Sequence, residues 1–213
     1  MLTKTNKGAF GVKTGKKAGE NRIYCRYVKR VLDILLSGIL IFFLLLPMFI
    51  IAVAIRADSR GKAIFKQERR GRHGKIFICY KFRTMYTDAP VNIPASSFED
   101  RDKYVTRAGR FLRQSSLDEL PQLFNVLKGD MSLVGPRPLI SAEKEMHFGR
   151  MNCGIYELRP GITGMAQING RNLLDDSEKL TNDRYYLDNL KLMLDIKILF
   201  RTISNVLHRD GVK

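Results

Sequence analysis

A stretch of 22 residues without a single charge, from Ile34 to Ile55, dominates the hydropathy pattern of the chain. As a straight helix it would be ~33 Å long at about 1.5 Å per residue, enough to span the hydrocarbon core of a bilayer. The core helix of a soluble protein is the weaker alternative, and a signal peptide would be shorter and end at a small-residue cleavage site. The pattern therefore predicts a helix inside a membrane.

Two features bear on how this segment sits in the membrane. Both of its flanks are basic, so the positive-inside rule is best satisfied if both ends stay cytoplasmic. Pro47 removes the helical hydrogen bond to the carbonyl of Phe43 and predicts a kink or a break. A broken helix that enters and leaves by the same face fits both features. A kinked helix that crosses the bilayer is favoured by the pattern alone, because prolines are tolerated in membrane spans.

A second apolar stripe lies near the C-terminus. Between Tyr186 and His208, apolar residues recur at helical spacing, with Lys191, Lys197 and Arg201 among them. A basic amphipathic helix of this kind can lie in a membrane interface, and it can equally be an ordinary helix that faces a protein core. Both alternatives remain open from the pattern.

Between these apolar segments, residues 63–68 and 75–82 read as two strands joined by a glycine-containing turn, a β-hairpin. Strand alternation puts Lys81 and Arg83 on the same face. Two cations at the end of a strand can hold a phosphate together, although two solvated charges are the simpler interpretation.

The segment from Arg113 to Gly129 predicts a short helix. Leu120, Leu123, Phe124 and Leu127 fall on one face, and Gly129 fits a C-terminal cap. A second, polar face carries Asp118, Gln122 and Asn125.

The start of this helix carries two adjacent acids. Ser116 and Glu119 have the spacing of a capping box, whereas Pro121 favours a start closer to Asp118. Either way the acids lie at a helix N-terminus, where the dipole keeps carboxylates ionised and attracts phosphate. They are candidates for a nucleophile and a metal ligand, and also for simple capping residues.

Two arginines lie in rigid, turn-rich surroundings. Arg137 stands between Pro136 and Pro138, and Arg159 precedes a Pro-Gly pair. Restricted backbones of this kind can preorganise guanidinium groups for an anion, although loop punctuation with solvated charge explains the same pattern.

The composition adds a strong basic excess. The 213 residues carry 37 Lys and Arg against 21 Asp and Glu, a formal charge of +16. Half of that excess lies in residues 1–30, and residues 1–21 lack apolar periodicity, which predicts a disordered basic arm. Cys25, Cys79 and Cys153 are too few and too scattered for a disulfide framework or a cysteine-rich zinc site. The charge alone is compatible with nucleic acid, a membrane surface or phosphorylated substrates.

Five strings follow one another in the chain: Lys81-Phe-Arg-Thr-Met85, Ser116-Leu-Asp-Glu-Leu-Pro-Gln122, Leu127-Lys-Gly-Asp-Met-Ser-Leu-Val-Gly-Pro-Arg-Pro138, Arg159-Pro-Gly-Ile-Thr-Gly164 and Asn169-Gly-Arg171. In this order they closely resemble the bacterial sugar transferase family, the small monotopic polyprenol-phosphate phosphoglycosyl transferases. The resemblance covers roughly residues 26–209 and departs from the family at Met165, where a tryptophan is common. Loss of that aromatic residue bears on membrane seating or sugar packing and touches no catalytic position.

The resemblance implies a reaction and its residues. Asp118 would attack the β-phosphorus of a nucleotide diphosphate sugar, such as a UDP-sugar, to release UMP and leave a phosphosugar on the enzyme. A polyprenol phosphate, such as undecaprenyl phosphate, would then accept the phosphosugar, the first membrane step of surface polysaccharide or glycoconjugate synthesis. Glu119 would help to hold Mg²⁺. Substrate or phosphate contacts would come from Lys81, Arg83, Arg113, Gln122, Arg137, Arg159 and Arg171.

The resemblance also implies an architecture and a location. The chain would be a mainly helical α+β protein with a small β-hairpin or sheet, a basic arm over residues 1–21, a membrane segment over 22–56 and a cytoplasmic catalytic domain over 57–213. The membrane segment would be re-entrant and broken at Pro47, which reverses the preference for a kinked span. The enzyme would sit on the cytoplasmic face of the bacterial inner membrane, with interfacial amphipathic helices in contact with anionic phospholipid. No nucleic-acid module is recognised, and the oligomeric state stays open, a homodimer included.

Overall fold

The computed structural model describes residues 24–91, 93, 98, 101–170 and 173–208. Within them the protein is mainly helical, with two small two-stranded sheets and one long apolar helix near the N-terminus. The α+β, mainly helical prediction is confirmed at that level. The predicted basic arm, residues 1–21, lies outside the described residues.

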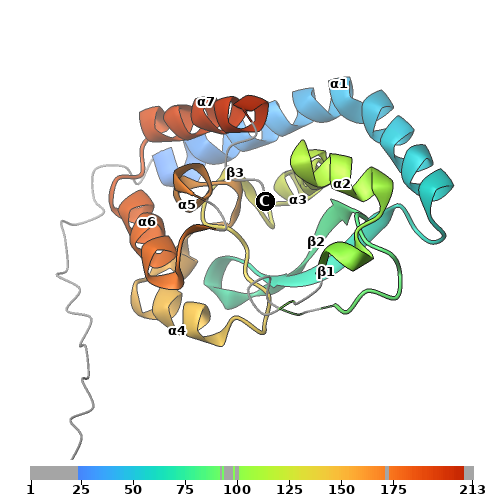
Figure 1. Cartoon of the computed structure of the whole chain (residues 1–213). Coiled ribbons are helices and arrows are strands. Elements are labelled where there is room, and N and C mark those ends of the chain that lie inside the picture. Colours follow the sequence, from blue (N-terminus) through green and yellow to red (C-terminus); the bar gives the residue numbers. More distant parts are fainter. Residues whose placement is uncertain (1–23, 92, 94–97, 99–100, 171–172, 209–213) are drawn as a thin grey trace, which may run out of the picture.

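The charge-free segment forms most of α1, Lys29–Asp58, which follows a π-helical turn η1, Tyr24–Val28. It is long and apolar enough to cross a membrane, and most of its apolar side chains are exposed. Pro47 lies inside the helix without interrupting it. The predicted break is therefore wrong and is replaced by a bend, because loss of one N–H donor leaves the neighbouring helical bonds in place. Figure 1 shows the axis of α1 turning downward at its C-terminal part.

Both ends of α1 are fastened to the rest of the protein. Near its start, Asp33 Oδ1 accepts a hydrogen bond of 3.0 Å from the main-chain N–H of Leu133. At its other end, Asp58 Oδ2 accepts a hydrogen bond of 3.1 Å from the N–H of Ala108. The helix therefore lies along the globular body, and Ile41, Leu44 and Met48 from its middle pack against the core.

The predicted hairpin is confirmed. Strands β1, Ile64–Arg70, and β2, Ile76–Phe82, pair antiparallel through a short 3₁₀ turn η2, Arg72–Gly74. The second sheet is parallel and joins β3, Ser132–Val134, to β4, Gly161–Thr163. This sheet brings together the string that ends at Pro138 and the string that begins at Arg159, and the candidate site is built on this contact.

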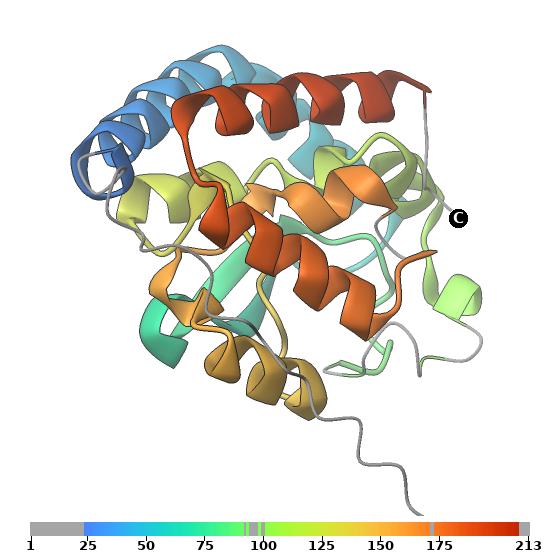
Figure 2. The ribbon, with the colours of Figure 1, turned by 90° about the vertical axis from the view of Figure 1, so that its left-hand side faces the viewer.

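Helices and 3₁₀ turns surround these two sheets. The 3₁₀ turn η3, Arg101–Tyr104, leads to α2, Arg107–Gln114, and a second 3₁₀ turn η4, Leu117–Glu119, precedes α3, Gln122–Lys128. Beyond β3 follow α4, Lys144–Asn152, and η5, Ile155–Glu157, and beyond β4 follow α5, Met165–Asn169, α6, Asp176–Asp188, and α7, Leu192–His208. Figure 2 shows α7 lying above α5 and α6, next to the start of α1.

The prediction of which side of α3 faces the core is wrong. Gly129 caps the helix in the left-handed conformation, at φ 94°, as expected. However, the supposedly polar Gln122 and Asn125 are buried, whereas Phe124 and Leu127 on the apolar face are more than a third exposed. Asn125 is buried because its amide pairs with the backbone of β2, donating 2.6 Å to Ile78 O and accepting 3.0 Å from Tyr80 N–H.

The apolar stripe near the C-terminus does not lie on one helix, as its spacing predicted. It belongs to two helices, because α6 ends at Asp188 and the chain turns at Asn189 before α7 begins. Across this turn, the hydroxyl of Tyr186 donates a hydrogen bond of 2.6 Å to the buried carboxylate of Asp195. In α7, Leu194 and Ile198 are buried while Phe200, Ile203 and Leu207 are exposed. The helix therefore has a core-facing side and a separate exposed apolar side.

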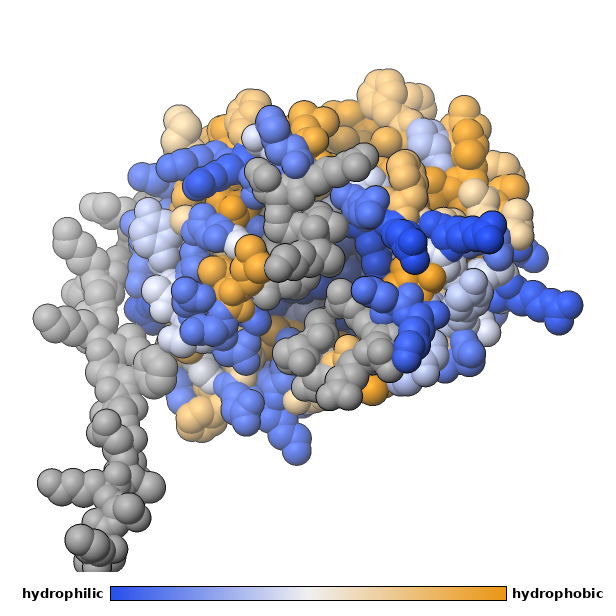
Figure 3. Space-filling view, viewed as in Figure 1, coloured by the Kyte–Doolittle hydropathy of each residue, from blue (hydrophilic) through white to orange (hydrophobic). Residues whose placement is uncertain are grey.

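The exposed apolar surface is concentrated on one side of the molecule. In Figure 3, orange surface runs along the top and upper right, where α1 and α7 lie in Figure 1, and blue surface covers most of the remainder. Exposed apolar side chains gathered in this way are typical of a surface that contacts lipid or another apolar partner.

Candidate active site

The two adjacent acids lie in the 3₁₀ turn η4, directly before α3. Ser116 adopts a left-handed conformation, at φ 56°, and its side chain makes no capping hydrogen bond. The capping-box interpretation of Ser116 and Glu119 is therefore wrong. The side chain of Glu119 instead turns toward β2, which brings the acids next to the hairpin.

Glu119 is held by two cations from different parts of the chain. Lys81 Nζ, at the end of β2, lies 2.7 Å from Glu119 Oε1, and Arg137 Nη1 lies 3.7 Å from the same oxygen. Both Lys81 and Glu119 keep about a fifth of their side chains exposed, whereas half of the Arg137 side chain is exposed. The carboxylate thus lies at a boundary between the protein interior and solvent.

Asp118 lies in a more apolar environment. Burial raises the pKa of its carboxyl above the ordinary value, and the negative charge of the neighbouring Glu119 raises it further. The positive charges of Lys81, Arg113 and Arg137 lower the pKa and so oppose this shift. The sequence predicted that a helix dipole would favour the ionised form, and burial outweighs that effect here. The three cations, rather than the dipole, favour the ionised carboxylate.

Arg137 owes its place to a close backbone packing between two glycine-rich motifs. Gly135 N–H donates 2.8 Å to Thr163 O, and Gly161 N–H donates 2.9 Å to Pro136 O. A β-carbon on Gly135 would lie 2.4 Å from the carbonyl oxygen of Arg159, and one on Gly161 would lie 2.1 Å from the Gly135 nitrogen. Glycine is therefore required where these two segments cross.

Three residues that the sequence did not single out support the Arg137 loop. Arg150 donates a hydrogen bond of 2.6 Å to the carbonyl of Arg137 and forms a buried ion pair of 2.6 Å with Asp183 on α6. Arg69 Nη1 donates 2.9 Å to the carbonyl of Pro138. Burial, together with the charge of Arg137, lowers the pKa of Arg69 to about 10. No local spacing joins these positions, so the sequence pattern carried no signal for them.

The remaining predicted site residues are distributed differently. Arg113 acts on Asp118 electrostatically and donates 2.9 Å from Nε to the hydroxyl of Thr84. Gln122 lies buried at the start of α3. Arg159 lies in a separate pocket with Arg30 and Arg72, and Arg171 lies outside the described residues.

Arg83 does not join Lys81 at the acids. Its buried guanidinium donates to the end of α1, 2.7 Å to Ser59 O and 3.0 Å to Ser59 Oγ, and it also binds the carbonyl of Arg60. Strand alternation failed for this residue because β2 ends at Phe82. In this structure Arg83 secures the C-terminal end of the apolar helix.

The described residues contain no cluster of three or more His, Cys, Asp or Glu side chains of the kind that forms an all-protein metal site. Asp118 and Glu119 still fit Mg²⁺, because this ion in phosphate-transfer sites is bound by one or two carboxylates together with substrate phosphates. Glu119 is the better placed of the two, because Lys81 and Arg137 hold its carboxylate at the boundary with solvent, whereas burial raises the pKa of the Asp118 carboxyl.

The chain has an exposed apolar helix and an Asp-Glu pair among cations, and its sequence matches one protein family. The profile of the bacterial sugar transferase family matches residues 24–209. The chain belongs to this family.

The similar proteins point in the same direction. The chain is 42% identical over 200 residues to an undecaprenyl-phosphate galactose phosphotransferase of Salmonella typhimurium, covering 87% of this chain and 42% of that protein. It is 45% identical over 166 residues to the uncharacterised sugar transferase EpsL of Bacillus subtilis, covering 78% of this chain and 80% of EpsL. It is 40% identical over 192 residues to a UDP-glucose:undecaprenyl-phosphate glucose-1-phosphate transferase of Caulobacter vibrioides, covering 86% of this chain and 71% of that protein. The chain thus spans less than half of the Salmonella relative.

Proposed function

We propose that the protein transfers a phosphosugar from a UDP-sugar to undecaprenyl phosphate or a similar polyprenol phosphate. The observation that carries this proposal is the Asp118–Glu119 pair, which shares a site with Lys81, Arg113 and Arg137. Phosphoryl transfer needs positioned cations and an unprotonated nucleophile rather than a general base. The name of the Caulobacter relative gives UDP-glucose as donor and undecaprenyl phosphate as acceptor, and the name of the Salmonella relative gives undecaprenyl phosphate and galactose.

The reaction would take place in two displacements. A carboxylate oxygen of Asp118 attacks the β-phosphorus of the UDP-sugar, and the bond from that phosphorus to the bridging oxygen breaks, so UMP leaves with the electron pair. A phosphate oxygen of the polyprenol phosphate then attacks the same phosphorus and releases the Asp118 carboxylate. Lys81, Arg113 and Arg137 stabilise the negative charge of the phosphoryl groups in both steps.

Mg²⁺ would be held by Glu119 together with diphosphate oxygens. When bound, the ion would neutralise charge at the leaving phosphate. Lys81 would assist metal binding, because its hydrogen bond to Glu119 fixes that carboxylate beside the site.

The way α1 is fastened supports a re-entrant arrangement. Both of its ends hydrogen-bond to the same globular body, through Asp33 at one end and through Asp58 and Ser59 at the other. With the whole body on one side of the bilayer, such a helix would enter and leave by the same face. We therefore propose a re-entrant, monotopic helix with its bend near Pro47, and a catalytic body on the cytoplasmic face of the inner membrane.

Two further surfaces support contact with lipid. The exposed apolar side of α7 continues the exposed side of α1, which suits a helix lying in the interface above anionic phospholipid. An apolar groove of about 560 Å³ opens beside the bend of α1, lined by residues that include Leu46, Phe49, Phe82 and Phe124. Leu117 and Leu120, which flank the acids, pack against the cluster that contains the groove residues Met48 and Phe82, so an isoprenoid chain in this groove would bring its phosphate toward the acids.

The decisive experiment is a UMP-release assay with purified full-length protein, undecaprenyl phosphate and a panel of UDP-sugars. Wild type should release UMP with one or more of them, and Asp118→Asn should release none and form no covalent phosphosugar adduct in intact-mass analysis. Asp188→Asn is the matched control, because Asp188 pairs with Arg184 on the exposed side of α6. Full turnover by Asp118→Asn would refute the covalent mechanism.

A further inference from the structure

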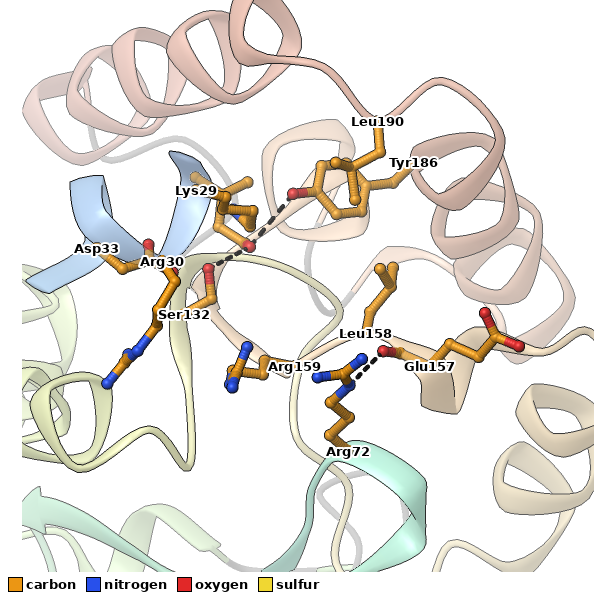
Figure 4. Close-up of a pocket in the computed structure, with 11 residues that line it drawn as sticks. Lys29, Arg30, Asp33, Arg72, Ser132, Glu157, Leu158, Arg159, Tyr186 and Leu190 are labelled. Atoms are coloured by element: carbon orange, nitrogen blue, oxygen red, sulfur yellow. Dashed lines mark hydrogen bonds between the residues drawn. The ribbon is translucent and has the colours of Figure 1, made fainter. Parts of the chain in front are cut away.

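A second group of cations surrounds a cavity of about 60 Å³ at the start of α1. The cavity lies where five segments meet: α1, the hairpin turn, β3, the segment before β4 and the end of α6. Its charged lining residues are Lys29, Arg30, Asp33, Arg72, Glu157 and Arg159. Figure 4 shows the guanidinium groups of Arg72 and Arg159 next to each other in the middle of this cavity.

These two arginines are held in place by one hydrogen bond each. Arg72 Nε donates 2.7 Å to the carbonyl of Glu157, and Arg159 Nε donates 3.0 Å to the carbonyl of Gly129. Each guanidinium has five N–H groups, so within the described part of the chain the main chain fixes the position of the group and leaves its Nη donors available. Fixed forks of this kind match the oxygen atoms of a phosphate.

The positive charge of this group is poorly balanced. Lys29 is paired with Asp195 at 2.6 Å, but Arg30 donates to main-chain carbonyls of α3, 2.6 Å to Val126 O and 2.9 Å to Leu127 O. The carboxylate of Glu157 points away from Arg72 in Figure 4. Burial and the neighbouring charges of Arg72 and Arg30 lower the pKa of Arg159, whereas Asp33 opposes that shift. An anion in the cavity would relieve this repulsion between three guanidinium groups.

The cavity has a lining of its own. None of the residues that line it is among Lys81, Arg113, Asp118, Glu119 and Arg137, the charged residues of the Asp118 site. We therefore treat an anion here as distinct from the diphosphate that would react at Asp118.

We propose that Arg72 and Arg159, with Arg30 beside them, form a second binding site that takes a phosphate group. The cavity volume of about 60 Å³ is several times the ~10–15 Å³ that one water molecule needs on the same measure, which suits one phosphate group. The exposed apolar residues of α1 begin at Val31 and Ile34, one turn from Arg30. If α1 lies in the membrane as proposed, the site is at headgroup depth, where a phospholipid phosphate or a free phosphate ester can reach it.

The test measures binding rather than catalysis, with full-length protein in neutral maltoside micelles at constant ionic strength. One arm titrates inorganic phosphate and the other titrates dihexanoyl-phosphatidylglycerol, and ³¹P line broadening reports binding. The pocket variant is Arg72→Gln/Arg159→Gln. The charge-matched control is Lys75→Gln/Lys144→Gln, which removes two exposed cations outside the cavity. Arg137→Gln serves as a second control for binding at the Asp118 site.

We expect saturable binding in at least one arm, about tenfold or more weaker in the pocket variant and within about twofold of wild type in both controls. The arm that saturates identifies the source of the phosphate. Equal loss in the pocket variant and the charge-matched control, loss confined to Arg137→Gln, or no saturable binding in either arm would overturn the proposal. If Arg159→Gln does not fold, Arg72→Gln alone gives the same comparison, because Arg72 is exposed at the mouth of the cavity. UMP release is assayed separately, so failure here is distinguishable from failure of the proposed reaction.

Discussion

Lys81 Nζ and Glu119 Oε1 are 2.7 Å apart, and this ion pair joins the end of strand β2 to the acidic turn before α3. The same lysine also favours the ionised form of Asp118, whereas Glu119 opposes it. One cation therefore acts on two carboxylates: it holds Glu119 in an ion pair and favours the ionised form of Asp118, which the proposed reaction requires.

This relationship predicts opposite shifts in the pH dependence of UMP release. Because burial raises the pKa of Asp118, the rate should fall as the pH drops through that raised pKa and the carboxylate becomes protonated. Lys81→Gln removes a charge that lowers the pKa and should move this acidic limb to higher pH. Glu119→Gln removes a charge that raises the pKa and should move the limb to lower pH.

Single-turnover rates measured across pH test both variants. The plateau rates should also fall, by about 10²–10³-fold for Lys81→Gln, because a charge aimed at the transferring phosphoryl group is lost. Acidic limbs that stay at the wild-type position in both variants would contradict the assignment of Asp118 as the titrating nucleophile.

A second prediction concerns the support of Arg137. Arg150→Met leaves Asp183 buried without its partner and removes the donor to the Arg137 carbonyl, and it should lower the free energy of unfolding by about 3–5 kcal/mol. Arg150→Met/Asp183→Leu replaces the pair by apolar groups and should recover most of that loss. Activity should stay at least about tenfold below wild type in the double variant, because the Arg137 carbonyl still lacks its donor. Full activity in the stable double variant would show that the pair acts on folding alone.

Some of the fold was predictable because a strong local pattern determines it. The absence of charge from Ile34 to Ile55 was enough to predict α1, and strand alternation around a glycine turn was enough to predict the β1–β2 hairpin. Gly129 marked the end of α3 correctly, since few other residues adopt its left-handed conformation. These signals depend on neighbouring residues only.

The errors share a different physical cause. Periodicity assumes that the apolar face of a helix is its buried face, but α3 buries Asn125 against the backbone of β2 and exposes Phe124 beside the bend of α1. A protein that presents apolar surface to a membrane reverses the usual pattern. The single helix predicted across Asn189 failed because the turn is stabilised by a tertiary contact, Tyr186 to Asp195.

The candidate site was also predictable only in part. The resemblance assigned Asp118, Glu119, Lys81 and Arg137 to one site, and the structure brings these four residues together, while their roles stay predictions. The arginines could not be assigned individually, because any of them can bind either an anion or a main-chain carbonyl. Arg83 binds the end of α1, and only the folded structure separates it from Lys81 two residues earlier.

A third prediction tests the packing that positions Arg113. A β-carbon on Gly109 in α2 would lie 2.0 Å from the carbonyl oxygen of Thr84, which cannot move freely because it accepts a hydrogen bond from Thr106 N–H. Gly109→Ala should therefore lower the free energy of unfolding by about 1–3 kcal/mol and displace Arg113 from Thr84. Gly38→Ala, at a helical glycine with nothing within 4 Å, is the control and should be neutral or stabilising by about 0.5–1 kcal/mol. Equal denaturation midpoints for the two variants would contradict this close approach.

The last prediction tests the re-entrant arrangement of α1. Cysteines introduced at Gly8, before the helix, and at Lys75, in the hairpin turn after it, should react equally with a membrane-impermeant maleimide in inside-out vesicles. Neither should react in intact cells or spheroplasts, because both ends of α1 would lie on the cytoplasmic side. The native Cys79 and Cys153 are buried and should add little background, and labelling of the unmodified protein measures what Cys25 contributes. Labelling of the Gly8 cysteine from outside and of the Lys75 cysteine from inside would show that α1 crosses the bilayer. In that case the hydrogen bonds that join both of its ends to one body, Leu133 to Asp33 and Ala108 to Asp58, could not exist together in the membrane.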